Sequence, residues 1–220
     1  MIQFSHVYKT YTGPIHALKN IELSIDKGEF VFLTGPSGAG KTTLFKMLSA
    51  FDKPTSGAVR VSGFDLNLIT AQEIPQFRRR IGVIFQDFKL LRDRCVFENV
   101  ALPLLARGDR AHQITRRVAE MLEQVGLSEK ARQLPDFISG GEQQRTAIAR
   151  ALIHQPGVLI ADEPTGNLDP KLSEEIMDLL ERVCAQGTTV VVATHDHEMV
   201  KRRSKRTIQI SDGSIVGDSR

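Results

Sequence analysis

Aromatic residues and cysteines are scarce in this sequence, and both shortages exclude classes of function. The 220 residues include no tryptophan, two tyrosines and two cysteines. Cys95 and Cys184 lie far apart and have no His or Cys neighbours at metal-ligand spacing. Neither a disulfide framework nor a zinc site is therefore expected, and a reducing cytosol fits. Basic stretches interleaved with aromatic residues are also missing, so no nucleic-acid partner is expected.

Long apolar runs are missing as well. No stretch approaches the roughly 18 apolar residues that cross a bilayer, and the first ten residues lack the charged and apolar regions of a signal peptide. Any membrane role is therefore expected to depend on a partner. The composition, 41% hydrophobic and 25% charged with a formal net charge of +3, is that of an ordinary globular domain. The basic run 201–206 is interpreted as a solvated helix face in preference to a contact with anionic lipid.

Short β-branched and aromatic runs alternate with helical patterns, which predicts an α/β fold with a mostly parallel central sheet. Strands are expected at 30–34, 81–85, 158–161 and 188–193, helices at 44–50, 111–125 and 142–154, and a hairpin with an Asp-Gly turn at 207–216. The segment from about 87 to 155 has few strand patterns. It is interpreted as a helical subdomain inserted between two parts of a single core, 1–86 and 156–220.

A glycine-rich segment follows the first of these strands and matches the phosphate-loop pattern GxxxxGK followed by Ser or Thr. The nucleotide-binding candidates are Gly35, Pro36, Ser37, Gly38, Ala39, Gly40, Lys41, Thr42 and Thr43. Backbone N–H groups of such a loop surround phosphates, and the following helix N-terminus favours negative charge. Lys41 is expected to reach the β and γ phosphates, and the Thr42 hydroxyl to bind Mg²⁺.

A second apolar strand ends in two acids, Asp162 and Glu163. A strand ending in Asp-Glu is weak evidence alone, because such acids are more often loop charges or helix caps. Together with the phosphate loop it predicts an ATPase site. Asp162 is expected to hold Mg²⁺ through water, and Glu163 to orient the attacking water.

The stretch Ile138-Ser-Gly-Gly-Glu-Gln-Gln-Arg145 resembles the LSGGQ signature of the ATP-binding-cassette family. The resemblance implies the family's P-loop NTPase fold, which has a RecA-like core, an antiparallel β part and a helical subdomain. It also implies a homodimer that sandwiches two ATP molecules, with Ser139, Gly140, Gly141 and Glu142 facing the nucleotide of the partner. The same residues read as a serine-capped helix start, and both interpretations hold together.

The resemblance assigns roles to further residues in the family's order. It implies that Gln86 contacts Mg²⁺ or the attacking water, and that His195 contacts the γ-phosphate. Asp169, in the segment Asn167-Leu168-Asp169, is implied to reach across the dimer. An upstream aromatic stacks on adenine in this family; Tyr11 is favoured for that role and Tyr8 stays the alternative.

The stretch from Phe85 to Leu104 resembles the bacterial cell-division members of the family more than its lipoprotein-release or macrolide-export members. That resemblance implies an integral membrane partner resembling FtsX, contacts with other division proteins, and a peripheral position on the cytoplasmic face of the inner membrane at the division site. An exporter or lipoprotein-release ATPase is the first alternative. A slow nucleotide-gated recruitment module is the second.

Overall fold

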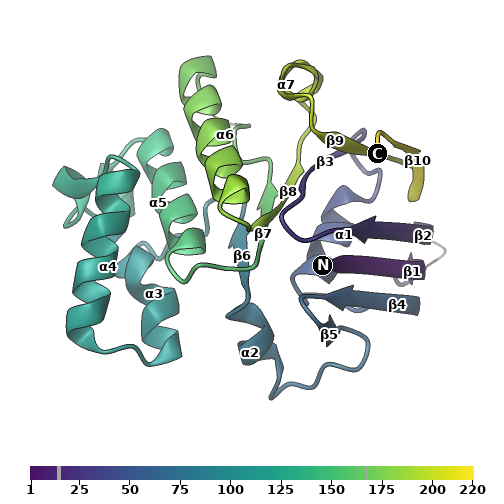
Figure 1. The fold of residues 1–220 in the computed structure, drawn as a ribbon, viewed down its shortest axis with the longest axis horizontal. Coiled ribbons are helices and arrows are strands. Elements are labelled where there is room, and N and C mark those ends of the chain that lie inside the picture. Colours follow the sequence, from purple (N-terminus) through teal and green to yellow (C-terminus); the bar gives the residue numbers. More distant parts are fainter. Residues whose placement is uncertain (14–15, 167) are drawn as a thin grey trace.

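The computed structural model describes residues 1–13, 16–166 and 168–220, and its centre is a six-stranded sheet (Figure 1). The strand order is β10-β9-β3-β8-β7-β6, in which β9 to β6 run parallel and β10 is antiparallel to β9. The strands of this sheet are β3 Phe30–Thr34, β6 Ile81–Ile84, β7 Val158–Asp162, β8 Thr189–Ala193, β9 Arg206–Ser211 and β10 Ser214–Asp218. All residues of β3 and β8 are buried, as expected of parallel strands covered on both faces.

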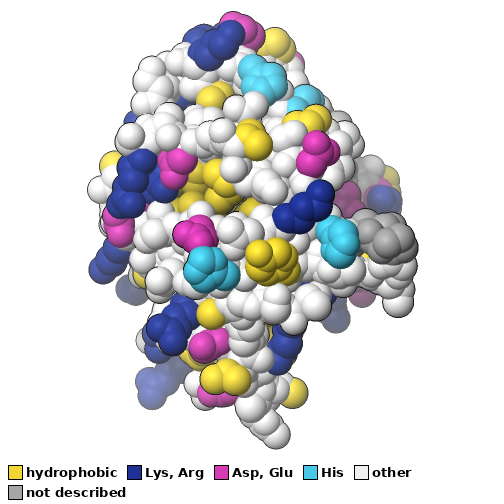
Figure 2. Space-filling model, turned by 90° about the vertical axis from the view of Figure 1, so that its right-hand side faces the viewer, with side chains coloured by type: hydrophobic (Ala, Val, Ile, Leu, Met, Phe, Trp, Pro, Cys, Tyr) yellow, Lys and Arg dark blue, Asp and Glu magenta, His cyan; other side chains and the backbone are white. Residues whose placement is uncertain are grey.

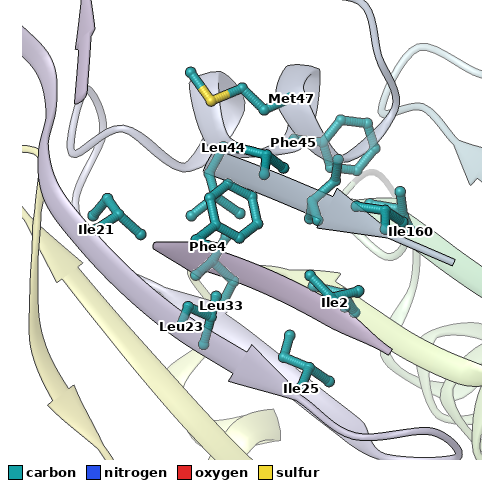
Figure 3. Close-up of a cluster of buried hydrophobic side chains, with 14 of the residues drawn as sticks. Ile2, Phe4, Ile21, Leu23, Ile25, Leu33, Leu44, Phe45, Met47 and Ile160 are labelled. Atoms are coloured by element: carbon teal, nitrogen blue, oxygen red, sulfur yellow. The ribbon is translucent and has the colours of Figure 1, made fainter. Parts of the chain in front are cut away.

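A second, antiparallel sheet has the order β2-β1-β4-β5. Its strands are β1 Ile2–Thr10, β2 His16–Ile25, β4 Ser56–Val61 and β5 Phe64–Asp65. Helix α1 (Lys41–Leu48) shares one hydrophobic core with both sheets. Figure 3 shows its side chains Leu44, Phe45 and Met47 gathered with Phe4 of β1 and Leu33 of β3. This packing fixes the helix that follows the phosphate loop.

The remaining helices cover the central sheet or lie beyond β6. They are α2 Ile74–Arg78, α3 Val96–Arg107, α4 Ala111–Gln124, α5 Gly140–Leu152, α6 Pro170–Ala185 and α7 His197–Arg203, with short 3₁₀ turns at Ser128–Lys130 and Pro135–Phe137. Helices α3, α4 and α5 lie side by side at the left of Figure 1 and enclose a core cluster of their own. That separate core supports the predicted helical subdomain, whose boundaries stay a prediction.

The predicted α/β fold and its parallel sheet are confirmed, with small differences at element ends. Helix α1 begins at Lys41 and not at Leu44, because the polar residues 41–43 carry no apolar signal. It ends at Leu48, since Ala50 has a positive φ of 52°. The hairpin turn is formed by Asp212 (φ 46°) and Gly213 (φ 77°), as an Asp-Gly turn requires.

Other sequence-based expectations concern membranes and cysteines. Within the described ranges no helix is long and apolar enough to cross a bilayer. Cys95 and Cys184 are free thiols. On the face seen in Figure 2, basic, acidic and histidine side chains are interspersed, and neither sign of charge dominates.

Candidate active site

A pocket of about 820 Å³ opens where several parallel strands end. Open parallel sheets place their ligand sites at these carboxyl ends. The pocket brings together residues that the sequence predicts to act on ATP, although they come from four separate parts of the chain. They are Ser37, Gly38, Gly40, Lys41, Thr42, Thr43, Gln86, Asp162, Glu163 and His195.

The phosphate loop between β3 and α1 needs glycine at two positions for steric reasons. Gly35 has φ 150°, and a Cβ there would lie 2.1 Å from the Ile210 carbonyl oxygen. Gly40 has φ 110°, and a Cβ would lie 2.8 Å from the Ala17 carbonyl oxygen. Gly40 is also the N-cap of α1 and supplies no side-chain cap. No capping side chain therefore occupies the first N–H groups of α1, and these donors are available to bind an anion.

Lys41 lies across this loop. Its ammonium donates to the carbonyl oxygens of Gly35 at 2.6 Å and of Pro36 at 3.0 Å. Both acceptors are neutral, so the charge of Lys41 is available to a phosphate at the edge of the same loop.

The loop has a contact with Gly213, a residue outside the predicted site, and Gly213 is itself held by a second hydrogen bond. The Gly213 N–H donates to Ala39 O (3.0 Å), and the Lys19 N–H donates to Gly213 O (2.7 Å). His16, Ala17, Lys19, Asp212 and Gly213 also line the pocket. The sequence predicts the Asp-Gly pair only as a hairpin turn, and nothing in it places that turn beside the phosphate loop.

Asp162 ends β7, and its carboxyl group is partly buried. Burial raises the pKa of Asp162, the negative charge of Glu163 adds to this shift, and the ammonium of Lys41 opposes it. A cation at this point would stabilise the ionised carboxylate. Thr42, Gln86 and Asp162 line the same pocket and offer oxygen ligands, the type that Mg²⁺ prefers.

Glu163 is held in an unusual backbone conformation beside His195. Its φ is 47°, and its N–H donates to Ala193 O (2.9 Å) in β8. Its Oε1 lies 2.8 Å from Nδ1 of His195, while its side chain is 11% exposed. A non-glycine residue pays a free-energy cost in this region, and such residues cluster at functional sites. The carboxylate and the imidazole are thus fixed together at the pocket wall.

Tyr11 is not among the residues that line this pocket. Its hydroxyl donates to Asp52 Oδ2 at 3.0 Å, and the Lys9 ammonium lies 4.9 Å from its ring centroid. Tyr8 is 42% exposed. Adenine stacking on Tyr11 stays a prediction.

The signature residues begin helix α5, away from the pocket lining. Ser139 is the N-cap: its Oγ accepts from the Glu142 N–H (3.3 Å), and Glu142 Oε2 accepts from the Ser139 N–H (2.7 Å). This is the predicted capping box. A Cβ on Gly141 would lie 2.3 Å from Leu172 Cδ2 in α6, so a larger residue there would have to displace the end of that leucine side chain. Ser139, Gly140, Gly141 and Glu142 do not line the pocket of their own chain.

Asp169 is the N-cap of α6, where its Oδ1 accepts from the Leu172 N–H at 3.0 Å. This contact gives Asp169 a structural role within one chain, as the cap of α6. Its implied role across a dimer stays a prediction. Asn167, named with it in the sequence, lies outside the described residues.

The profile of the ABC transporter family matches residues 18–166, which include the phosphate loop, the signature and the Asp162-Glu163 pair. The chain belongs to the ABC transporter family. One curated relative is the cell division ATP-binding protein FtsE of Mycobacterium tuberculosis, which is 53% identical over 99% of this chain and 95% of that protein. Another is the FtsE protein of Escherichia coli K12, which is 48% identical over 99% of this chain and 98% of that protein. The resemblance to cell-division ATPases is therefore confirmed.

Solved ABC structures share the fold over the whole chain. The dimeric post-hydrolysis structure of the ATP-binding cassette MJ0796, bound to ADP and Pi, has a TM-score of 0.93 and 39% identity, and covers 100% of this chain and 98% of that one. CbiO1 from Clostridium perfringens has a TM-score of 0.89 and 30% identity, and the match covers 99% of this chain and 87% of that one. The chain therefore has the fold of an ABC ATPase.

Proposed function

We propose that this chain is the Mg-ATP-binding and ATP-hydrolysing subunit of an FtsEX-like membrane complex. In this proposal, ATP-driven closure of a dimer is transmitted to a transmembrane partner resembling FtsX, which controls septal cell-wall hydrolysis in cell division. The observation that carries it is one pocket that gathers phosphate-loop residues with Asp162, Glu163 and His195, in a chain about half identical to FtsE proteins along its length. Gly35, Pro36 and Ala39 of the predicted loop do not line that pocket.

The phosphate loop would bind ATP through backbone N–H groups and the ammonium of Lys41. Thr42, Gln86 and Asp162 would hold Mg²⁺, Asp162 through water, and the ion would neutralise charge on the phosphates. The N-terminal end of helix α1, which has no capping side chain, adds favourable positive partial charge to the same region. Together these groups bind and orient the triphosphate.

Glu163 would orient and polarise the attacking water. Its contact with His195 fixes the carboxylate direction, and His195 is left to reach the γ-phosphate with its other ring nitrogen. Fixed polar groups of this kind lower the barrier because they need little reorganisation during the reaction.

A second copy would complete the site. Ser139 and the glycines stand at the start of a 13-residue helix, an anion-favouring position, yet they do not line the pocket of their own chain. A head-to-tail homodimer would place them against the partner's nucleotide, with Asp169 near the same interface. The dimeric state of MJ0796 supports this arrangement.

The complex would lie on the cytoplasmic face of the bacterial inner membrane, with this chain as its peripheral subunit at the division site. The FtsE relatives support this position.

The test uses Glu163→Gln, which keeps the phosphate loop but removes the carboxylate that polarises water. We expect ATP binding to persist, steady-state hydrolysis to be abolished, and the closed dimer to accumulate. Tagged variant trapped with ATP is extracted from its host's membranes in mild detergent, and the bound membrane protein is identified by mass spectrometry.

The matched control is Glu123→Gln, an exposed glutamate of α4, which should turn over ATP like the wild type. Recovery of an FtsX-like protein supports the proposal. Recovery of an exporter or lipoprotein-release permease would reject the division role and leave the ATPase chemistry intact.

A further inference from the structure

The backbone directly after Gln86 forms a strained turn. Phe88 and Lys89 have positive φ values of 59° and 48°. Residues with a Cβ rarely adopt this conformation, and they keep it only where surrounding contacts hold them there. Something outside the turn must therefore stabilise it.

Arg150, in the last turn of helix α5, supplies such contacts. Its Nη1 donates to Lys89 O and its Nη2 donates to Phe88 O, each at 2.6 Å. The two donors of a planar guanidinium have a fixed geometry that matches two adjacent carbonyl oxygens, whereas the ammonium of a lysine stands on a flexible stem and is less pre-organised for them. The same side chain thus holds both strained residues.

The charge of Arg150 is directed at this turn and not at an acid. Burial lowers the pKa of Arg150, which reflects the cost of removing the guanidinium from water. Within residues 1–13, 16–166 and 168–220, no carboxylate lies within ion-pair distance of it. A cation in this setting gains most from strong hydrogen bonds to oriented carbonyl groups.

Helix α5 is fixed close to Arg150 against the strand that leads to Gln86. A Cβ on Gly82 of β6 would lie 2.4 Å from the Ala151 carbonyl oxygen, so the helix end and the strand touch through their backbones. His154 Nε2 lies 3.0 Å from Ile81 O, also in β6. The start of β6 therefore has a firm attachment to α5, and Arg150 provides one beyond the end of the strand.

The same helix also contacts the segment after Glu163. Gln144 is 1% exposed, and its Nε2 donates to Pro164 O at 2.6 Å. Helix α5 is thus bonded to the backbone that follows two pocket residues, Gln86 and Glu163. Its other end carries Ser139.

We propose that Arg150 is a positioning residue of the ATPase: it fixes the Phe88–Lys89 turn on α5 and so sets where Gln86 stands in the nucleotide pocket. This inference rests on the proposed ATP hydrolysis. Arg150 does not line the pocket, so it acts on the reaction through Gln86. A displacement of about 1 Å at a reacting centre can cost about 100-fold in rate.

The experiment compares Arg150→Gln and Arg150→Lys with the wild type in steady-state ATP hydrolysis. We expect kcat to fall about 10- to 100-fold in Arg150→Gln, with KM for ATP changed less than about twofold, because the phosphate loop is intact. Arg150→Lys keeps the charge but loses the planar, pre-organised pair of donors, and we expect an intermediate kcat. Arg132→Gln, at an exposed arginine that does not line the pocket, is the matched control and should resemble the wild type.

Two further readouts separate positioning from a general structural role. In a Gln86→Ala background, Arg150→Gln should cause no additional loss of kcat, since both changes remove the same interaction. Hydrogen exchange should rise in residues 86–95 of Arg150→Gln and stay unchanged in the phosphate loop. The exchange readout does not depend on activity, and Arg150→Lys replaces Arg150→Gln throughout if the latter fails to fold.

An unchanged kcat in Arg150→Gln, an additive loss in the Gln86→Ala background, or unchanged exchange at 86–95 would each overturn the proposal. Hydrolysis by the wild type in the same assay keeps this outcome distinct from a failure of the proposed function. If the wild type does not hydrolyse ATP, the ATPase proposal fails, and the exchange measurement alone decides whether Arg150 holds the turn.

Discussion

The ammonium of Lys41 donates hydrogen bonds to neutral acceptors, the carbonyl oxygens of Gly35 and Pro36. Its removal should therefore cost little in folding and much in phosphate binding. For Lys41→Ala we expect ATP affinity to fall about 10- to 100-fold, since hydrogen bonds to charged groups are worth about 1.5–3 kcal/mol. Isothermal titration calorimetry with a non-hydrolysable ATP analogue measures this loss.

Lys46 provides the control for this prediction. It lies on the same helix with its side chain exposed, so Lys46→Ala removes a lysine without touching the pocket. We expect its affinity to equal that of the wild type. Wild-type affinity in a folded Lys41→Ala variant would count against the phosphate-loop assignment.

At the scale of elements, the hairpin β9–β10 is attached to the rest of the fold through Arg206. This nearly buried guanidinium bonds to Glu29 (2.8 Å) and to Asp218 (2.7 and 2.9 Å). The hydrogen bonds from Arg206 hold the pKa of Asp218 below its ordinary value, although burial partly opposes them. A carboxylate with a lowered pKa stabilises the folded state above its unfolded pKa, and this contribution is lost as pH falls through the folded value.

The variant Asp218→Asn should lower the free energy of unfolding by about 1 kcal/mol at pH 7, the usual net value of one such hydrogen bond. The difference from the wild type should shrink below about pH 4, where Asp218 of the unfolded wild type begins to bind a proton, and should vanish as pH falls through the lower folded pKa. Urea denaturation between pH 3 and 7 measures it. Asp93→Asn, on a side chain that is 79% exposed, should stay close to the wild type at each pH. A difference independent of pH would contradict the assignment to this carboxylate.

The elements differ in how well the sequence predicts them. Strands β3, β7 and β8 are continuous apolar runs because both of their faces are covered, so they are evident without a structure. Strand β1 is not, since register shifts between Phe4 and Lys9 interrupt its period of two. Helix α3 contains Pro103, which weakens a helical pattern.

The residues of the candidate site also differ in how well the sequence predicts them. The phosphate loop, Asp162-Glu163 and the Ser139 cap are local patterns, and the sequence identifies them before any fold is known. The contacts of Gly213 with the loop and of Arg150 with the turn join segments 61 or more residues apart along the chain. No local pattern encodes such contacts, because they depend on tertiary packing.

At the scale of the whole molecule, the signature residues 139–142 lie outside the nucleotide pocket of their own chain. A bulky charged residue at Ser139 should therefore affect dimerisation and not ATP binding. In Ser139→Arg, each chain should bind ATP with wild-type affinity, because Ser139 does not line its own nucleotide pocket. ATP-driven dimerisation should be lost, since a guanidinium would occupy the interface. Size-exclusion chromatography with light scattering, in the Glu163→Gln background with ATP, measures the dimer.

Ser139→Thr is the matched variant, because threonine keeps the N-cap of α5. We expect it to dimerise with ATP. Normal dimerisation of Ser139→Arg would reject the head-to-tail sandwich.

The pocket lining runs from His16 to Gly213, and the phosphate loop touches β9 through Gly35 and Ile210. During synthesis, β3 leaves the ribosome well over 100 residues before its sheet neighbours β8 and β9, so the loop lacks part of its pocket wall and its support from β9 for most of translation. A nascent chain therefore cannot close its nucleotide site early. The full set of pocket residues is present only when translation has reached the hairpin β9–β10.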